Sequence, residues 1–365
     1  MRIGLLTGGG DCPGLNAVIR AVVKGLVLRH GATVVGFEDG FEGLIEDRAR
    51  ELSYRDASGI LTLGGTVLGT SNKANPFQYF RAAGADVSDQ ALATYARHGL
   101  DGLVVIGGDG TMTIAHGLIG RGMRVVGVPK TIDNDLVGTD RTFGFDTAVS
   151  IAAEAIDRLH TTAQSHHRVM ILETMGRYAG WIALHAGVAA GADVILLPEF
   201  PYHLDEVVRV CRTREAGGQK FTIIAMAEGA HPLGGDRAVL KTIPDSPDPI
   251  RLGGTCQVLG VALEAHLDSE VRTTILGHVQ RGGTPTPFDR VLSTRFGVHA
   301  ADLIAAGRSD VMVALHNGQM GEVAILDVAD KTRLVTADDP VVRAGVAVGT
   351  SFGVPDLAPD LTRTV

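Results

Sequence analysis

Short apolar runs alternate with one-sided apolar helices along most of the chain. The runs of strand length are residues 3–7, 34–37, 103–106, 125–128, 169–172, 194–197, 221–226 and 272–276. Apolar residues recur at helical spacing after Pro13 and within residues 90–98, 146–160, 177–190, 256–267 and 288–306. Residues 311–326 have the pattern of a hairpin that turns at Asn317-Gly318. This alternation predicts an α/β protein with two doubly wound, Rossmann-like sheets.

Polar residues directly follow two of these apolar runs. The sequence GGDGT, residues 107–111, follows the run 103–106, and PKTIDND, residues 129–135, follows the run 125–128. A strand, a glycine turn and a helix in succession point backbone N–H groups at an anion bound at the positive end of the helix dipole. We expect both polar segments to leave neighbouring strands at the same sheet edge, where open α/β sheets bind their ligands.

Carboxylates and phosphate-binding groups coincide in these two segments. Asp109, Asp133 and Asp135 are expected to meet Lys130 and Thr131 beside the glycine turn. Carboxylates repel phosphates unless a cation bridges them or one carboxylate takes up a proton. Phosphoryl transfer needs Mg2+ to neutralise phosphate charge and a base to accept a hydroxyl proton. The alternative is a solvated acidic loop beside a structural turn.

The start of the chain repeats the order of strand, turn and helix. Gly8, Gly9 and Gly10 follow the run 3–7, and Pro13 stands at the opening of the expected helix, where its missing N–H costs little. This order again suits a phosphate. The alternative is that the glycines only allow a tight corner.

Five segments resemble the 6-phosphofructokinase family: GGGD at 8–11, GGDGT at 107–111, PKTIDND at 129–135, MGR at 175–177 and GHVQRGG at 277–283. The chain is similar to bacterial members, and in particular to actinobacterial ones with a mixed ATP/pyrophosphate signature. The resemblance implies phosphorylation of fructose 6-phosphate at O1, giving fructose 1,6-bisphosphate in glycolysis. It also implies two domains with the active site in the cleft between them. Residues 1–144 with 280–332 would bind the phosphoryl donor, and residues 145–279 with 333–365 would bind fructose 6-phosphate.

The resemblance assigns the chemistry to a few residues. Asp133 takes the hydroxyl proton, Asp135 keeps Asp133 oriented, and Asp109 holds Mg2+ against the donor phosphates. Thr131, Arg177 and the Gly10 N–H stabilise the charge on the transferred phosphoryl group.

The implied donor-binding residues are Gly10, Phe41, Asn72, Lys73, Asp109, Gly110, Thr111 and Lys130. Phe41 holds the position of an aromatic residue near the nucleotide base, although it could equally fill a hydrophobic gap. Many nucleotide-dependent members have an arginine where this chain reads Asn72-Lys73. A lysine there supplies a point charge without the two-pronged contact of a guanidinium.

The implied residues for fructose 6-phosphate are Thr131, Asp133, Arg168, Met175, Gly176, Arg177, Glu228, Arg272, His278 and Arg281. Arg168 and Arg272 reach the sugar phosphate from a neighbouring subunit, whereas His278 and Arg281 grip it from the home subunit. Sharing of this kind requires at least a homodimer, and the family suggests a homotetramer. We expect the four arginines and His278 at strand ends or in the adjoining turns; ordinary surface ion pairing is the alternative.

Two positions give opposite indications of the donor. Gly110 follows the pattern of ATP users, because a side chain there would crowd the α-phosphate, whereas Lys130 follows the pattern of pyrophosphate users. We expect ATP, because a lysine attracts phosphate and can swing aside. The alternatives are a pyrophosphate-dependent fructose 6-phosphate 1-phosphotransferase and a catalytically silent sugar-phosphate-binding subunit. NAD and lipid kinases also contain GGDGT, but they lack the TIDND segment with a downstream HVQR.

The bacterial ATP enzymes that the chain resembles bind an effector phosphate between subunits through several basic residues. Arg20 and Lys24 are retained at the matching positions, but Leu63, His160 and Gly217 stand where further positive groups would be expected. We therefore expect weak or absent control by ADP or phosphoenolpyruvate.

Composition limits the partners and the compartment. The 33 basic and 41 acidic residues give a net charge of −8, which argues against a general nucleic-acid binder. Cys12, Cys211 and Cys256 lack metal-type spacing and suit a reducing cytoplasm, and packing is favoured over a redox role for Cys12. No apolar run reaches membrane-spanning length and no signal peptide precedes the first strand, so a cytoplasmic protein is expected.

Two stretches have less regular patterns. Residues 229–254 are rich in Pro, Gly and Asp and are predicted to form a surface insertion. The final forty residues are predicted to pack against the second sheet and to end in a disordered segment.

Overall fold

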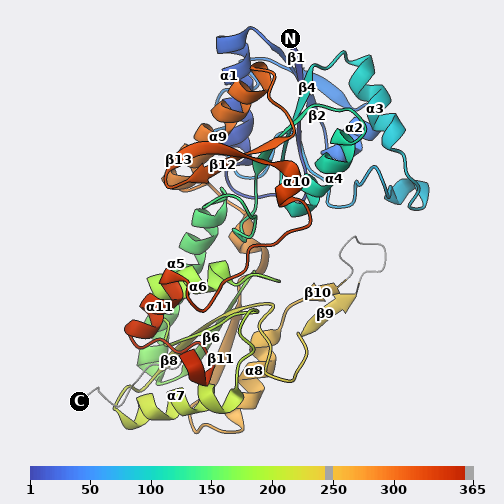
Figure 1. Cartoon of the computed structure of the whole chain (residues 1–365). Coiled ribbons are helices and arrows are strands. Elements are labelled where there is room, and N and C mark those ends of the chain that lie inside the picture. The colour runs from blue at the N-terminus through green and yellow to red at the C-terminus, as the bar shows by residue number, and fades with distance from the viewer. Residues whose placement is uncertain (243–249, 358–365) are drawn as a thin grey trace. The chain divides into compact units, whose positions relative to one another are not determined.

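The computed structural model of the protein describes residues 1–242 and 250–357 (Figure 1). The chain divides into two compact units. The first consists of Met1–Thr147 and Arg281–Thr332, and the second of Ala148–Gln280 and Arg333–Val365. Each unit contains a sheet of mainly parallel strands, as the alternation of apolar runs predicts.

The first unit contains a seven-stranded sheet with the strand order β13-β12-β5-β4-β1-β2-β3. Its strands are β1 (Arg2–Thr7), β2 (Thr33–Phe37), β3 (Ala49–Leu52), β4 (Gly102–Gly107), β5 (Val125–Pro129), β12 (Val311–His316) and β13 (Gln319–Ala324). Neighbours from β12 to β2 pair in parallel, whereas β3 and β13 are antiparallel edge strands. The predicted hairpin is confirmed, and its turn residues Asn317 and Gly318 have φ values of 49° and 79°.

Helices cover both faces of this sheet. They are α1 (Leu15–His30), α2 (Phe41–Glu46), α3 (Ser88–Arg97), α4 (Asp109–Ile119), α9 (Pro287–Ala305) and α10 (Ile325–Val328), with a short 3-10 helix η1 (Phe80–Ala82). Figure 1 shows α1 and α9 on one face, and α2, α3 and α4 on the other. Because both faces are covered, every residue of β4 and β5 is buried, which explains why these strands read as continuous apolar runs.

The second unit contains a four-stranded sheet with the order β11-β6-β8-β7, in which all neighbours pair in parallel. Its strands are β6 (Val169–Thr174), β7 (Val194–Leu196), β8 (Thr222–Ala227) and β11 (Val271–Ile275), with a separate antiparallel ribbon of β9 (Val239–Thr242) and β10 (Ile250–Leu252). The helical elements are α6 (Trp181–Ala189), α7 (Leu204–Ala216), α8 (Thr255–Glu264), α11 (Pro340–Ala347), η2 (Gly277–Arg281) and η3 (Pro355–Leu357). Helix α5 (Phe145–His166) carries the chain out of the first unit.

Some details of the second unit differ from the sequence predictions. The helix predicted from residue 177 begins at Trp181, so Arg177 lies in the turn between β6 and that helix. The predicted insertion, residues 229–254, contains the β9–β10 ribbon, and its residues 243–249 lie outside the described part of the chain. Of the final forty residues, 333–357 belong to this unit, with Ser351 bridged to Val194, whereas 326–332 belong to the first unit. The predicted disordered end falls on residues 358–365, which also lie outside the described residues.

No helix within residues 1–242 and 250–357 combines the length and the apolar character that a membrane crossing would need.

Helices α1 and α9 approach each other closely at Gly297. A Cβ atom at this position would lie 2.6 Å from the Cβ of Ala21 and 2.8 Å from the carbonyl oxygen of Val18. Real Cβ contacts are longer than this, so any side chain at position 297 forces the two helices apart. Glycine is therefore required here by packing.

We expect Gly297→Ala to lower the free energy of unfolding by about 1–3 kcal/mol, because the extra methyl group overpacks the contact between α1 and α9. Urea unfolding followed by circular dichroism measures the change. Gly110→Ala is a matched control at another helical glycine, since a Cβ there meets no atom within 4 Å. This control should not lose stability, and an equal loss in both variants would contradict the packing argument.

Candidate active site

Three adjacent parallel strands of the first unit end at one sheet edge. Ile3–Thr7 of β1 pairs with residues 102–106 of β4, and residues 103–107 of β4 pair with 125–129 of β5. Residues 8–10 (the glycine turn), the start of α4 and residues 130–135 therefore leave the sheet side by side. The prediction that the two polar segments leave neighbouring strands is confirmed.

The glycine turn packs tightly against its neighbours. Gly9 has a φ of 76°, in the left-handed region that favours glycine. A Cβ at Gly8 would lie 2.6 Å from Thr111 Oγ1, and a Cβ at Gly10 would lie 2.7 Å from Arg281 Nη1. Arg281 also donates a hydrogen bond of 3.0 Å from Nη1 to the carbonyl oxygen of Asp11. Arg281, which the resemblance assigns to the sugar phosphate, thus contacts the glycine turn in this structure.

The first turn of α4 is open to solvent. Its N-cap, Gly108, makes no side-chain capping hydrogen bond, and Asp109 and Gly110 are exposed. Gly110 lies outside the left-handed region and no protein atom would meet its Cβ, so packing within the chain gives no reason for a glycine there. The Thr111 side chain is buried against Gly8, so an anion at this helix end would meet Thr111 through its backbone.

Asp133 and Asp135, the acidic pair, lie in a braced loop. The Asp133 N–H donates a 3.0 Å hydrogen bond to Thr131 Oγ1, and the Thr142 hydroxyl donates one of 2.7 Å to the Thr131 carbonyl. Burial, and then the charges of Asp133 and Asp109, raise the pKa of Asp135 to about 7, against a smaller effect of the Thr131 hydrogen bond. Asp135 is therefore close enough to Asp133 and Asp109 to be affected by both charges.

Lys130 is buried behind the glycine turn. Its side chain is only 4% exposed, and its ammonium group donates a hydrogen bond to the Gly10 carbonyl. Burial lowers the pKa of Lys130. In this structure Lys130 therefore contacts the turn that would hold a phosphate.

Of the predicted nucleotide contacts, Phe41 differs most from expectation. It is 2% exposed and belongs to the hydrophobic core beneath α2, α3 and α4, which favours the gap-filling alternative over a contact with a base. Asn72 and Lys73 are exposed in the loop that follows β3. This loop returns to the glycine turn, since the Gly9 N–H donates to the Ser71 carbonyl at 3.4 Å.

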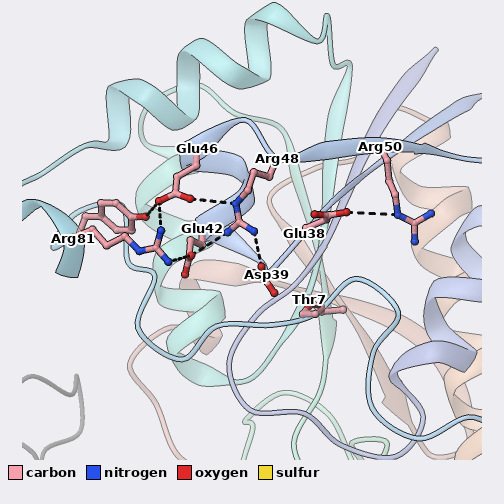
Figure 2. Close-up of polar contacts among 10 residues, drawn as sticks. Thr7, Glu38, Asp39, Glu42, Glu46, Arg48, Arg50 and Arg81 are labelled. Atoms are coloured by element: carbon pink, nitrogen blue, oxygen red, sulfur yellow. Dashed lines mark hydrogen bonds and ion pairs between the residues drawn. The ribbon is translucent and has the colours of Figure 1, made fainter.

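Figure 2 shows a cluster of ionic contacts around α2 that the sequence analysis did not predict. Arg48 donates to Asp39 at 2.6 Å, to Glu42 at 3.0 Å and to Glu46 at 3.2 Å. Arg81 pairs with the same two glutamates, and the Tyr79 hydroxyl donates to Glu46 at 2.5 Å. The Tyr79 hydrogen bond is the main cause that lowers the pKa of Glu46. The cluster fixes this six-residue helix, which follows the loop at the end of β2.

The residues of the second unit that are predicted to bind fructose 6-phosphate separate into two groups. Met175, Gly176 and Arg177 follow the carboxyl end of β6, Glu228 follows that of β8, and His278 follows that of β11. Arg168 precedes β6, and Arg272 pairs in register with Met170 near the start of the same strand. At about 3.3 Å per residue, roughly 13 Å of strand separates Met170 from Thr174. The arginines and His278 thus do not share one edge, and Arg168 and Arg272 both pair with Glu270 at the opposite edge.

Glycine is required beside Arg177. Gly176 has a φ of 130°, and a Cβ at Gly229 would lie 2.1 Å from the Arg177 carbonyl oxygen. The Arg177 guanidinium lies 5.0 Å from the ring centre of the exposed Tyr178, and the Met175 N–H donates to Gln280 at 3.4 Å. The turn after β6 is therefore packed closely against the segment after β8.

The described residues contain a candidate magnesium ligand but no preformed metal cluster. Among residues 1–242 and 250–357 there is no group of three His, Cys, Asp or Glu side chains placed to hold a metal ion. Mg2+ is usually bound through one or two carboxylates together with substrate phosphates, so the exposed Asp109 suits such a site.

Cys12, Cys211 and Cys256 are free and buried, and burial raises the pKa of Cys12 to about 12, which keeps its thiol protonated.

Comparison with known proteins gives consistent matches. A profile of the family "Phosphofructokinase" matches residues 2–304. ATP-dependent 6-phosphofructokinase 2 of Clostridium perfringens is 49% identical over 96% of this chain and 98% of its own length. Pyrophosphate–fructose 6-phosphate 1-phosphotransferase of Amycolatopsis mediterranei is 50% identical over 93% of this chain and 97% of its own. The solved phosphofructokinase of Saccharomyces cerevisiae is 29% identical with a TM-score of 0.75; the match covers 95% of this chain and 46% of the yeast chain, so this chain spans slightly less than half of that one.

We expect Asp135→Asn to stabilise the metal-free protein at pH 8 and to stabilise it only about a third as much at pH 5, where the unfolded chain is already mostly ionised at this position. Asp135 has a pKa of about 7 in the folded protein and about 3.9 in the unfolded chain. The free energy of unfolding therefore falls as pH rises through that interval, by at most about 4 kcal/mol. Thermal unfolding in EDTA at both pH values measures the difference. Asp338→Asn is the control, because a hydrogen bond from Thr336 lowers the pKa of Asp338 and predicts the opposite sign at pH 8. Equal shifts at pH 5 and pH 8 would contradict the raised pKa of Asp135.

Proposed function

Because this chain belongs to the phosphofructokinase family, we propose that it is an ATP-dependent 6-phosphofructokinase. It transfers the terminal phosphoryl group of ATP to O1 of fructose 6-phosphate. The observation that carries the proposal is the single sheet edge at which the glycine turn, the start of α4 and the acidic pair meet. Anion-binding N–H groups beside carboxylates are the combination that phosphoryl transfer needs.

Asp133 is the proposed base. As O1 of the sugar bonds to the terminal phosphorus and the bond to the leaving ADP breaks, Asp133 accepts the hydroxyl proton. The raised pKa of Asp135, caused by its burial and then by the charges of Asp133 and Asp109, supports different roles for the two members of the acidic pair. Asp135 is proposed to keep Asp133 oriented.

Thr131, Arg177 and the Gly10 N–H are proposed to stabilise the charge on the moving phosphoryl group. The braced loop supports the role of Thr131, and the tight packing around the glycine turn supports that of Gly10. Such fixed donors lose little energy to reorganisation during the reaction.

Asp109 is proposed to hold Mg2+. The ion would neutralise donor phosphate charge at the start of α4. The exposed carboxylate of Asp109, whose charge is felt by Asp135, supports a cation at this place.

The first unit is proposed to bind the donor and the second to bind fructose 6-phosphate. The residues that would bind fructose 6-phosphate from its own subunit are Met175, Gly176, Arg177, Glu228 and His278. Arg281 would join them either by leaving the glycine turn or by contacting the turn and the sugar phosphate together. Arg168 and Arg272 lie at the opposite edge of the second sheet, which supports their acting from a neighbouring subunit. This proposal requires at least a homodimer, and a homotetramer would satisfy it. A reducing cytoplasm is the proposed compartment and suits the free cysteines.

Gly110 supports ATP as the donor. The chain itself gives no packing reason for a glycine at this position, whereas an α-phosphate over the helix end would. Lys130, from the pyrophosphate pattern, is tied to the Gly10 carbonyl and does not fill the space over Gly110. Pyrophosphate remains the second candidate donor, because relatives of either name are about equally similar. A silent sugar-binding subunit is disfavoured, because it has no need of Asp133 and Asp109 together.

Donor use separates the two candidates. We expect purified protein to phosphorylate fructose 6-phosphate with MgATP far faster than with pyrophosphate in an aldolase-coupled assay. Gly110→Asp should reduce ATP use by about 10²-fold or more, because a carboxylate there clashes with and repels the α-phosphate, while any pyrophosphate use falls less. Gly110→Ala is the steric control and should have an intermediate effect. Faster turnover with pyrophosphate would reverse the choice of donor, and no turnover with either would support the silent subunit.

We expect Asp133→Ser to reduce kcat by about 10³-fold or more with sugar binding retained, because the proton acceptor is lost. Steady-state kinetics gives kcat, and calorimetry gives the affinity for fructose 6-phosphate. Asp338→Ser, which changes an exposed aspartate, should match the unchanged protein. A variant at position 133 that keeps a rate within a few-fold of normal would remove Asp133 from the role of base.

A further inference from the structure

We propose that Thr70 is a positioning residue that aims the Gly10 N–H at the transferred phosphoryl group. The inference deepens the proposed function and rests on it. Thr70 lies in the loop after β3, outside every segment that carries the family resemblance. Its hydroxyl donates to the Gly9 carbonyl at 2.6 Å and also lies 3.0 Å from the Thr7 carbonyl.

The contact between Thr70 and the Gly9 carbonyl also fixes the direction of the Gly10 N–H, because of the geometry of the peptide bond. The Gly9 carbonyl and the Gly10 N–H belong to one peptide group, which is planar and trans, so the two bonds point in opposite directions. A hydroxyl that holds the carbonyl from one side therefore directs the N–H toward the other. Thr70 thus acts on the reacting group through Gly9 without touching it.

The peptide group between Gly9 and Gly10 needs such a contact because both residues are glycines. Gly9 has a φ of 76°, and glycine crosses between conformations at little steric cost, so the peptide group between Gly9 and Gly10 is intrinsically free to rotate. Without a contact behind it, the N–H would be distributed over several directions. An N–H that is fixed before the reaction stabilises developing charge better than one that must reorient.

The next two peptide groups are held in the same manner. Lys130 donates to the Gly10 carbonyl, and Arg281 donates to the Asp11 carbonyl at 3.0 Å. Three successive carbonyls, those of Gly9, Gly10 and Asp11, are thus held by side chains from three separate segments. Within the described part of the chain nothing accepts a hydrogen bond from the N–H of Gly10 or Asp11. Both N–H groups remain available to an anion.

The loop that carries Thr70 is itself anchored. The Thr7 hydroxyl donates to the Gly69 carbonyl at 2.5 Å, and the Asp39 N–H donates to the Leu68 carbonyl at 2.8 Å. The Asp39 carboxylate also accepts from Arg48, so the ionic cluster of Figure 2 holds the residue whose N–H contacts this loop. Thr70 is therefore held by a fixed frame, which a positioning group needs.

The test compares Thr70→Val, Thr70→Ser and Thr350→Val in the full-length protein. Valine keeps the shape of threonine and removes its hydroxyl, whereas serine keeps the hydroxyl. Thr350 is the matched control, because its buried hydroxyl also donates to a backbone carbonyl, that of Ala192 at 3.0 Å, in the second unit. The measurements are kcat and KM with MgATP, and amide hydrogen exchange in the peptide that contains residues 8–12.

We expect Thr70→Val to lower kcat by about 10-fold with the KM for fructose 6-phosphate unchanged, because a misdirected N–H loses part of its charge stabilisation. Exchange at the glycine turn should become faster. Thr70→Ser should restore both values to near normal, and Thr350→Val should change neither.

A kcat for Thr70→Val within two-fold of normal, or a loss that serine does not restore, would overturn the inference. So would unchanged exchange at residues 8–12. If the unmodified protein fails to phosphorylate fructose 6-phosphate with either donor, the proposed function fails instead, and the exchange comparison still decides whether Thr70 holds the turn. A loss of stability alone, shared with Thr350→Val, would mean that Thr70 is structural.

Discussion

The parallel pairing of β1, β4 and β5 is the constraint on which the candidate site depends. Parallel neighbours end at one edge, so segments separated by about a hundred residues in sequence leave the sheet side by side. The arrangement brings Asp109, Asp133 and Asp135 together, and burial of Asp135, with a further effect of the two neighbouring charges, raises its pKa. Burial of β4 and β5 on both faces holds the edge in place against this repulsion.

The sequence predicted the parallel strands, the hairpin and the shared edge because these follow from local patterns, whereas β3, β9 and β10 were not predicted. The apolar runs have the length of buried strands, and the glycine turn and the GGDGT segment directly follow such runs. The predicted hairpin at Asn317-Gly318 is present for the same reason, since both residues accept positive φ values. The family comparisons agree with the resemblance that these segments carry.

What the sequence did not predict depends on contacts between distant residues. The hydrogen bonds from Thr70, Lys130 and Arg281 to the carbonyls of residues 9–11 depend on which loops return to the glycine turn, and no local pattern encodes that return. The ionic cluster around Arg48 likewise joins α2 to residues 79–81. The start of α6 was predicted four residues too early, because Arg177 to Gly180 carry a pattern compatible with either a helix or a turn. The glycine at position 180 is compatible with a turn as well as with a helix, so it leaves this boundary open.

Glu270 has a consequence for how Arg168 and Arg272 meet an anion. Both guanidinium groups pair with this one carboxylate, so a phosphate that bound them, as proposed, would have to displace Glu270. A singly charged anion gains little from such an exchange, because it replaces one negative charge with another of equal size. A phosphate dianion brings a second charge and a third oxygen acceptor, so the exchange favours it over carboxylates. Glu270 would thereby make the two arginines selective for anions with two negative charges.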